Sequence, residues 1–153
     1  MNRLKHTNAG FTLVELVIVI LIIGILSAIA VPSYRGYVLR ATRADAKKAL
    51  LARAADLERC FTRNNSYLNN PAGSCLVVGN LPDGSSTTYR VEADPDGVNG
   101  GPGGITATTF AIRAVPIGRQ VADTKCGTFK IDDKNSRAVT GTFAATPQDC
   151  WGR

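Results

Sequence analysis

One apolar run constrains this chain more than any other feature. Residues 11–31 read FTLVELVIVILIIGILSAIAV, with 17 apolar residues among 21. A helix of this length rises about 30 Å, which matches the hydrocarbon core of a bilayer. Globular helices are seldom apolar on every side, so a buried core helix is disfavoured. The run therefore predicts a membrane-spanning helix.

A cleaved secretory signal peptide is the main alternative for this run. Arg3 and Lys5 would form its basic region, and Ala28-Ile29-Ala30 has the small residues of a cleavage site. The length of the run argues against it. Glu15 also argues against it, because a charged carboxylate inside hydrocarbon costs about 2.5–3.5 kcal/mol. An acid that is kept at such a cost usually has a partner.

The net charge is divided unevenly along the chain. The 153 residues carry 18 Lys and Arg against 12 Asp and Glu, a net charge of +6. Residues 1–10 contribute +2, residues 11–34 contribute −1, residues 35–63 contribute +5 and residues 64–153 contribute 0. A basic chain suggests nucleic acid as a partner. Here the excess lies just beyond the apolar run, where anionic lipid headgroups fit equally well.

The residues at the start of the run are distinctive. Gly10 ends a polar leader and precedes Phe11-Thr12-Leu13-Val14-Glu15, and Pro32-Ser33-Tyr34 follow the run. This N-terminus resembles that of the type IV prepilins, whose signature is a Gly, an aromatic residue and a Glu at the fifth mature position. The resemblance implies that prepilin peptidase cuts between Gly10 and Phe11, that the new amine of Phe11 is methylated, and that the apolar run is kept.

The same resemblance implies an orientation and a set of partners. The leader, residues 1–10, would lie in the cytoplasm and the head in the periplasm, until the subunit leaves the inner membrane for an extracellular filament. Positive-charge counting favours the opposite orientation, because Arg35, Arg40 and Arg43 follow the run; the leader is the more specific signal. The implied partners are other pilin subunits, prepilin peptidase, the inner-membrane assembly platform and, before assembly, membrane lipid.

The same resemblance implies a role for Glu15 in filament assembly. Its carboxylate would pair with the N-terminal ammonium of Phe11 on an adjacent subunit, in surroundings of low dielectric constant that strengthen the attraction. Glu15 is therefore predicted to set the register between subunits.

A helical pattern continues beyond the run. Leu50, Ala54, Leu57 and Phe61 recur at spacings of four, three and four, so one helix is expected over residues 11–63, with an amphipathic second half. Gly24 and Pro32 are expected to weaken or break it, and the resemblance implies that this stretch loosens in the filament. Five basic residues form either a solvated face or a contact with lipid headgroups or neighbouring subunits: Arg35, Arg40, Arg43, Lys47 and Lys48.

Residues 64–153 are expected to form a globular head built on a sheet. Apolar and polar residues alternate over residues 89–93, 110–114 and 129–131, and more weakly over 139–143. The short connections favour antiparallel pairing. The expected fold class is α+β: the type IV pilin fold, in which a long N-terminal helix, membrane-spanning in its first half, packs on a C-terminal antiparallel sheet of about four strands.

The glycine-rich segment 94–104 does not match the pattern of a known ligand-binding loop. An EF-hand loop needs an oxygen ligand where Val98 stands and a glutamate where Ile105 stands. No strand-to-helix context supports a phosphate cradle. A mobile loop between strands is favoured, and a weak calcium site involving Asp94 and Asp96 is the alternative.

The cysteines favour a disulfide framework. They are four in number, as expected of a segment outside the inner membrane: Cys60, Cys75, Cys126 and Cys150. Three pairings are possible, and Cys60–Cys75 with Cys126–Cys150 is favoured because each pair is local in sequence. Zinc is disfavoured, since no Cys-x-x-Cys is present and the single histidine, His6, lies in the leader. No metal, cofactor or enzymatic activity is expected, because the mature chain would lack a Ser-His or Cys-His pair.

The subtype rests on weaker motifs in the head. Thr124-Lys125-Cys126-Gly127-Thr128 and Asp149-Cys150-Trp151 resemble minor pilins of the PilE/ComP type, and ComP relatives bind DNA. A minor pilin that primes or joins the filament is the first interpretation; a major structural pilin, a DNA-uptake receptor and a type II secretion pseudopilin are the alternatives. DNA would need a basic stripe, and it is not favoured because eight acidic residues balance the head. The stripe would comprise Arg90, Arg113, Arg119, Lys125, Lys130 and Arg137.

Overall fold

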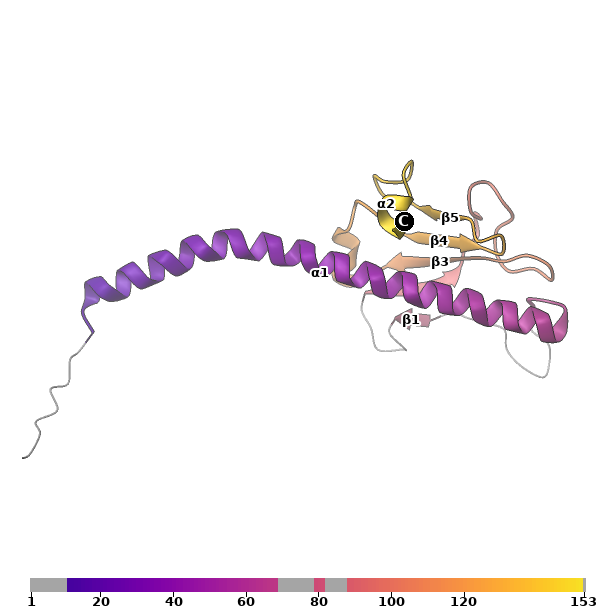
Figure 1. Ribbon diagram of the computed structural model, residues 1–153, viewed down its shortest axis with the longest axis horizontal. Helices are drawn as coiled ribbons and strands as arrows, with labels where there is room; N and C mark the ends of the chain where they lie inside the picture. The colour runs from indigo at the N-terminus through magenta and orange to yellow at the C-terminus, as the bar shows by residue number, and fades with distance from the viewer. Residues whose placement is uncertain (1–10, 69–78, 82–87, 153) are drawn as a thin grey trace, which may run out of the picture. The chain divides into compact units, whose positions relative to one another are not determined.

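The structure is a long helix followed by an antiparallel sheet and a short C-terminal helix (Figure 1). It is a computed structural model that describes residues 11–68, 79–81 and 88–152, with the backbone alone at 79–81. The chain divides into two compact units, residues 1–38 and residues 39–153. We call the second unit the head.

Helix α1, Leu13–Asn64, has a cap at each end. At the start, the Glu15 backbone N–H donates to Thr12 Oγ1 at 3.2 Å, which satisfies one of the free N–H groups of the first turn. At the end, Asn65 has a left-handed φ of 52° and its N–H donates to the Phe61 carbonyl at 2.7 Å. Asparagine tolerates this conformation better than most residues, so it closes the helix.

The first half of α1 is apolar and exposed. Its best 18-residue window has a mean hydropathy of 3.0, and none of that window is buried within the protein. By length and composition, the helix can cross a membrane. α1 runs through Gly24 and Pro32 without interruption, so the expected break at these residues is absent from this structure. Proline removes only one backbone donor, and the hydrogen bonds on both sides hold the helix together. Loosening in a filament stays a prediction.

The sheet is a five-stranded antiparallel meander in the order β1-β2-β3-β4-β5. Its strands are β1 (Gly79–Leu81), β2 (Tyr89–Ala93), β3 (Ala111–Pro116), β4 (Phe129–Asp132) and β5 (Arg137–Val139). The expected α+β class and antiparallel pairing are confirmed, with one strand more than expected. Two short helices complete the head: the 3₁₀ helix η1 (Gly118–Ala122) and α2 (Gln148–Trp151).

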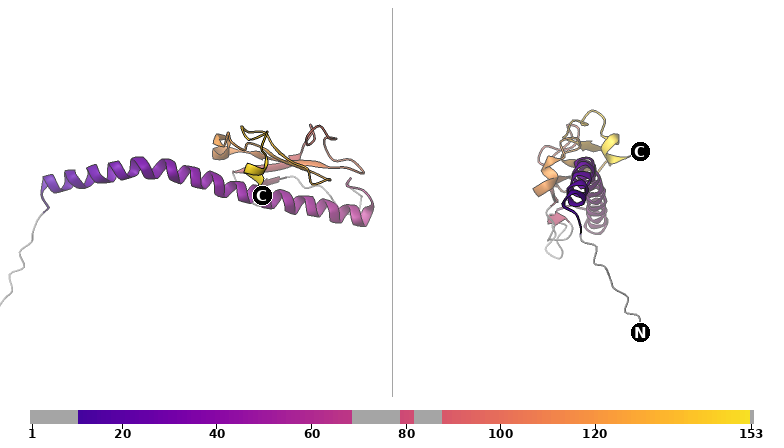
Figure 2. Two further views of the ribbon diagram at one scale, coloured as in Figure 1. Left: turned by 45° about the horizontal axis from the view of Figure 1, so that its top comes forward. Right: turned by 90° about the vertical axis from the view of Figure 1, so that its left-hand side faces the viewer.

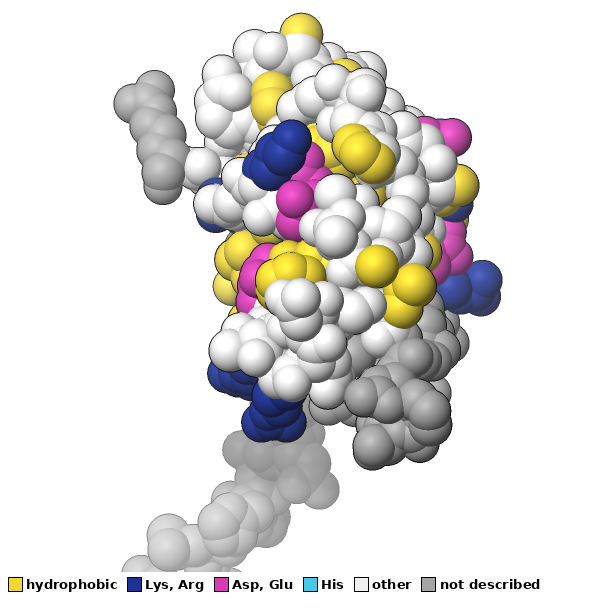
Figure 3. All heavy atoms as spheres, turned by 90° about the vertical axis from the view of Figure 1, so that its right-hand side faces the viewer, with side chains coloured by type: hydrophobic (Ala, Val, Ile, Leu, Met, Phe, Trp, Pro, Cys, Tyr) yellow, Lys and Arg dark blue, Asp and Glu magenta, His cyan; other side chains and the backbone are white. Residues whose placement is uncertain are grey.

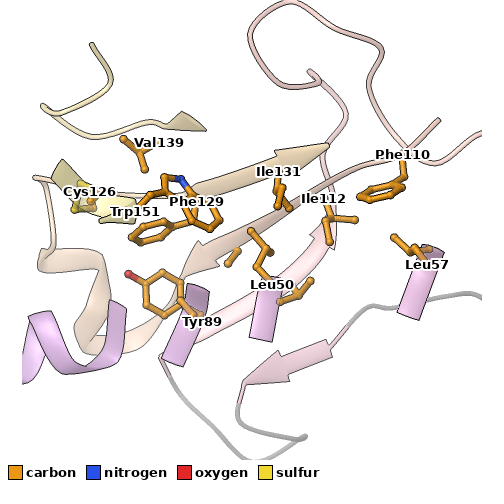
Figure 4. Packing of buried hydrophobic residues seen from close by; sticks show 14 of the residues in the cluster. Leu50, Leu57, Tyr89, Phe110, Ile112, Cys126, Phe129, Ile131, Val139 and Trp151 are labelled. Atoms are coloured by element: carbon orange, nitrogen blue, oxygen red, sulfur yellow. A yellow bond between two sulfur atoms is a disulfide. The ribbon is translucent and has the colours of Figure 1, made fainter. Parts of the chain in front are cut away.

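The core lies between one face of this sheet and the second half of α1, as the left view of Figure 2 shows. The sheet contributes alternate residues of β2, β3 and β4, and α1 contributes Leu50 and Leu57, both fully buried. Each buried Leu side chain is worth about 1.5–3 kcal/mol relative to an exposed one. Figure 4 shows the side chains of Tyr89, Ile112, Phe129 and Ile131 from the sheet on the side of Leu50 and Leu57. Val91 and Ala114 belong to the same cluster. The amphipathic stripe predicted for the helix is confirmed.

The exposed edge of β5 is covered by the C-terminal helix. Trp151 Nε1 donates to the Ala138 carbonyl at 3.1 Å, and its ring packs edge-on against Phe129 with centroids 5.4 Å apart. The weak strand predicted over residues 139–143 is shifted, because β5 covers Arg137–Val139. Residues 140–143 instead make backbone hydrogen bonds to residues 124–128. The edge is therefore short and partly capped, which discourages pairing with other chains.

Candidate functional site

The N-terminal residues of the described chain are all available for contacts with other molecules. Phe11 is 75% exposed and Glu15 is exposed. Gly10, and with it the proposed cleavage bond, lies outside the described residues. Sequence reasoning missed Thr12 as the helix cap, although Thr12 and Glu15 have the spacing of a capping box and could have been found by that pattern.

Two of the five basic residues after the apolar run are used inside the head. Arg43 makes a bidentate ion pair with the buried Asp123, with both N···O distances at 2.6 Å. Lys47 Nζ donates to the carbonyls of Cys150 and Trp151 at 3.1 and 3.2 Å. Burial, with the nearby Arg43 charge, lowers the pKa of Lys47. The solvated-face interpretation is thus wrong for this pair.

The other three basic residues, Arg35, Arg40 and Lys48, are exposed. They make no hydrogen bond or ion pair to any residue that the structure describes.

A buried polar network attaches η1 to α1. Gln120 is 2% exposed and donates through Nε2 to the Leu39 carbonyl at 3.4 Å and to the Tyr89 hydroxyl at 3.1 Å. Its side-chain oxygen accepts from the Thr42 hydroxyl. Burial raises the pKa of Tyr89 to about 12. The network leaves Arg119 and Val121, on either side of Gln120, facing solvent.

The outer face of the sheet carries a row of charged residues. Glu92, Arg113 and Lys130 lie side by side on β2, β3 and β4. Arg113 Nη2 is 2.7 Å from Glu92 Oε1, and Lys130 Nζ is 2.9 Å from an oxygen of Asp94, a fully buried carboxylate. Asp96 lies within 4.0 Å of both cations. Three acids therefore surround two bases, and the cluster has a net charge of −1.

This cluster changes the interpretation of the glycine-rich segment. Lys130 and Arg113 stand beside Asp94, where a calcium ion would have to bind. Within the described residues, no group of three or more acidic, Cys or His side chains is arranged to hold a metal. The segment is also closed on itself, because Gly104 N–H donates to the Asp94 carbonyl at 2.6 Å and Lys130 Nζ to the Gly97 carbonyl at 3.4 Å. This packing supports neither the calcium site nor an open loop.

The six basic residues of the predicted stripe therefore separate into groups. Arg113 and Lys130 are held in the acidic cluster, and Arg137 lies over the Trp151 ring at 5.3 Å. Arg90 is exposed on β2. Arg119 and Lys125 are exposed and have no acidic partner in the part of the head that the structure describes. On the face in Figure 3, basic side chains are scattered, several of them beside acidic ones.

Threonines occur in the two backbone segments that pair next to Lys125. The backbone of residues 124–128 pairs with that of residues 140–143, so Thr142 N–H donates to the Thr124 carbonyl and Thr140 N–H to the Thr128 carbonyl. Thr124, Thr140 and Thr142 are exposed. We call these residues, with Lys125 and Thr128, the threonine–lysine surface; it offers several uncharged donors beside one cation.

A disulfide joins Cys126 to Cys150 and closes this region. This is one of the two pairs that the sequence favours. Cys60 is also disulfide-bonded, whereas Cys75 lies outside the described residues. Residues 126 and 150 are both buried, so the bond ties α2 and its Trp151 to the sheet.

Two family comparisons match most of the chain. Residues 5–31 match the prokaryotic N-terminal methylation motif. Residues 32–130 match the family of the type IV minor pilin ComP, a DNA uptake sequence receptor. The chain belongs to the type IV pilins, in the ComP family. Pilins are structural subunits, so this pilin is not an enzyme.

Two relatives named as a fimbrial protein and a pilin agree with this placement by sequence. A fimbrial protein of Moraxella nonliquefaciens is 34% identical over 88% of this pilin and 90% of its own length. The type IV major pilin protein PilA of Myxococcus xanthus is 35% identical over 61% of this pilin, which spans only 41% of that relative. The structure of a type IV pilin from Shewanella oneidensis covers 75% of this pilin and 99% of that chain, at 27% identity and a TM-score of 0.46.

Proposed function

We propose that this pilin is a minor subunit of a type IV pilus and that its head binds double-stranded DNA during DNA uptake. The match of residues 32–130 to the ComP family supports this proposal, since ComP, which gives the family its name, is a DNA uptake sequence receptor. It gives DNA binding, which the balanced head charge disfavours, precedence over a minor pilin that only primes or joins the filament. A balanced head charge does not prevent binding, because a local surface makes the contacts.

The N-terminal part of the proposal follows the family pattern. Prepilin peptidase removes residues 1–10, Phe11 becomes the methylated N-terminus, and residues 11–31 hold the subunit in the inner membrane until assembly. In the filament, Glu15 pairs with the amine of Phe11 on a neighbouring subunit. The exposed apolar half of α1 supports this, since those side chains have no cover within the head.

The DNA contact is proposed for Arg119 and the threonine–lysine surface. Phosphate contacts come from Arg and Lys and also from Ser and Thr hydroxyls, and they position a protein on the duplex. Arg119 and Lys125 are exposed and lie outside the acidic cluster. Arg113 and Lys130 are paired with Glu92 and Asp94, which neutralise most of the positive charge that would attract a phosphate. The predicted stripe is thereby reduced to Arg119 and Lys125, to which we add the hydroxyls of the threonine–lysine surface.

Fluorescence anisotropy with a labelled duplex tests this contact. The full chain in a neutral detergent should bind at low salt, and log K should fall with log[salt] by about 0.9 for each phosphate contact. Arg119→Gln and Lys125→Gln should each reduce the slope by about 0.9, whereas Lys48→Gln, an equal loss of charge on α1, should leave it unchanged. Negligible binding at 50 mM salt, or a slope insensitive to both variants, would contradict the proposal.

A major structural pilin is the second candidate, because the Moraxella relative is a fimbrial protein matched over nearly its whole length. Counting copies of this subunit per length of sheared pilus by mass spectrometry separates the two. A minor pilin is present at a small fraction of the main subunit. A pseudopilin of a type II secretion system would instead show as loss of secretion with normal pili.

A further inference from the structure

The residues that follow the apolar run are mostly exposed. The run ends at Val31, and the head begins at Leu39. Tyr34 and Tyr37 between them are 68% and 64% exposed, and Arg35 is also exposed. The side chains of these three residues make no hydrogen bond or ion pair to another described residue. We call residues 32–38 the collar.

The position of the collar can be calculated from the helix. α1 is continuous from Leu13 to Asn64, and each residue adds about 1.5 Å of rise. Residues 32–38 therefore lie about 2–10 Å beyond the last residue of the apolar run. The headgroup layer on each side of a bilayer is about 5–8 Å thick. With residues 11–31 in the hydrocarbon, the collar coincides with the headgroups.

The chemistry of the collar fits that layer. Tyrosine is enriched at membrane interfaces, where its ring lies against the acyl chains and its hydroxyl reaches water. Tyr34 and Tyr37 are three residues apart and thus lie on one side of the helix. No acidic residue occurs between Glu15 and Asp45, so nothing nearby on α1 neutralises Arg35. Arg43, farther along α1, is already paired with Asp123.

We propose that the collar is a binding surface for anionic phospholipid headgroups of the periplasmic leaflet, with Arg35 as the charged contact and Tyr34 and Tyr37 as depth anchors. The surface fixes how far the span is inserted before assembly, and the lipid must be released when the subunit is extracted. The inference rests on the membrane insertion proposed above and is independent of DNA binding.

The lipid contact is tested with the full chain in nanodiscs of phosphatidylcholine that contain a trace of spin-labelled lipid. Spin-labelled phosphatidylglycerol should be retained at the protein more strongly than spin-labelled phosphatidylcholine. A cation at a membrane surface contributes about 1 kcal/mol, so Arg35→Gln should reduce this preference about five-fold. The attraction decays over about 8–10 Å.

Two further basic residues on α1 allow the effect of a lost charge to be compared at increasing distance from the end of the apolar run. Arg40 lies about 13 Å beyond Val31 and Lys48 about 25 Å beyond it, counting the same rise. Arg40→Gln should therefore reduce the preference less than Arg35→Gln, and Lys48→Gln should not change it. Equal effects of the three variants, or no preference for phosphatidylglycerol in the wild type, would overturn the lipid contact while leaving insertion intact.

The anchoring role is tested by a depth measurement. No described cysteine is a free thiol. A nitroxide label attached to the variant Ser33→Cys therefore gives a signal from residue 33. The depth of the nitroxide in the bilayer is measured from its collisions with oxygen and with a water-soluble relaxant. This depth should change when Tyr34 and Tyr37 are both replaced by Ala. It should stay unchanged in the control variant Tyr67→Phe, which lies in the head. An unchanged depth in the double variant overturns the anchoring role. A nitroxide at Ile22→Cys checks insertion; full exposure to water there refutes both the span and the collar.

Discussion

At the scale of single residues, the ion pair between Arg43 and Asp123 is a buried contact between α1 and the segment after η1. The Asp123 side chain is 1% exposed and that of Arg43 is 15% exposed. Removing one partner of a buried pair leaves an uncompensated charge and costs about 3–5 kcal/mol. Asp123→Asn should therefore lower the free energy of unfolding by about 3 kcal/mol, measured by urea titration in neutral detergent with Trp151 fluorescence as the signal.

An exposed pair on the same helix is the matched control. Arg59 lies 3.0 Å from Asp56, and their side chains are 71% and 42% exposed. Asp56→Asn should cost less than about 1 kcal/mol. Equal urea midpoints for the two variants would mean that Asp123 contributes nothing by its burial. No sequence pattern indicated this pair, because Asp123 lies in a polar stretch that resembles any surface turn and is 80 residues from Arg43.

At the scale of elements, the segment between β2 and β3 depends on glycines. Gly97 has a φ of +70°, and a Cβ there would lie 2.1 Å from the Gly101 carbonyl oxygen. Gly100 has a φ of +80° but open space around it. Gly100→Ala should cost about 1–2 kcal/mol for the left-handed backbone alone. Gly97→Ala should cost clearly more and should speed hydrogen exchange of the Gly104 N–H; equal costs would contradict the steric explanation.

The elements that sequence reasoning found share a strong periodic pattern. β2 and β4 alternate buried and less buried residues from Tyr89 and Phe129 onward, and the helix stripe through Leu50 and Leu57 is regular. β1 was missed because three residues, Gly79–Leu81, are too few to show a period. The closed glycine-rich segment was missed because its stability comes from Asp94 and Lys130, which are 36 residues apart. Local patterns contain no information about such contacts.

At the scale of the whole molecule, the two units differ in how much of their apolar surface is buried. Among the described residues, the buried hydrophobic side chains begin at Ala46, and all the exposed large hydrophobic ones except Leu51, Leu68 and Val121 precede residue 39. The head therefore has a complete core of its own, while the first unit needs a bilayer or other subunits to cover it. The basic excess of residues 35–63, a net charge of +5, lies on α1 and not on the sheet.

This division predicts where the chain can be shortened. A fragment of residues 39–153 should fold as a monomer without detergent, because it keeps the core and the contacts of Leu39, Thr42 and Arg43 with Gln120 and Asp123. A fragment of residues 45–153 keeps the same core but leaves Asp123 without its cation, and should be about 3 kcal/mol less stable. Thermal unfolding followed by near-ultraviolet circular dichroism of Trp151 compares them. If the two fragments melt together, the polar network contributes nothing to the head; if the longer fragment aggregates, the head depends on the first unit after all.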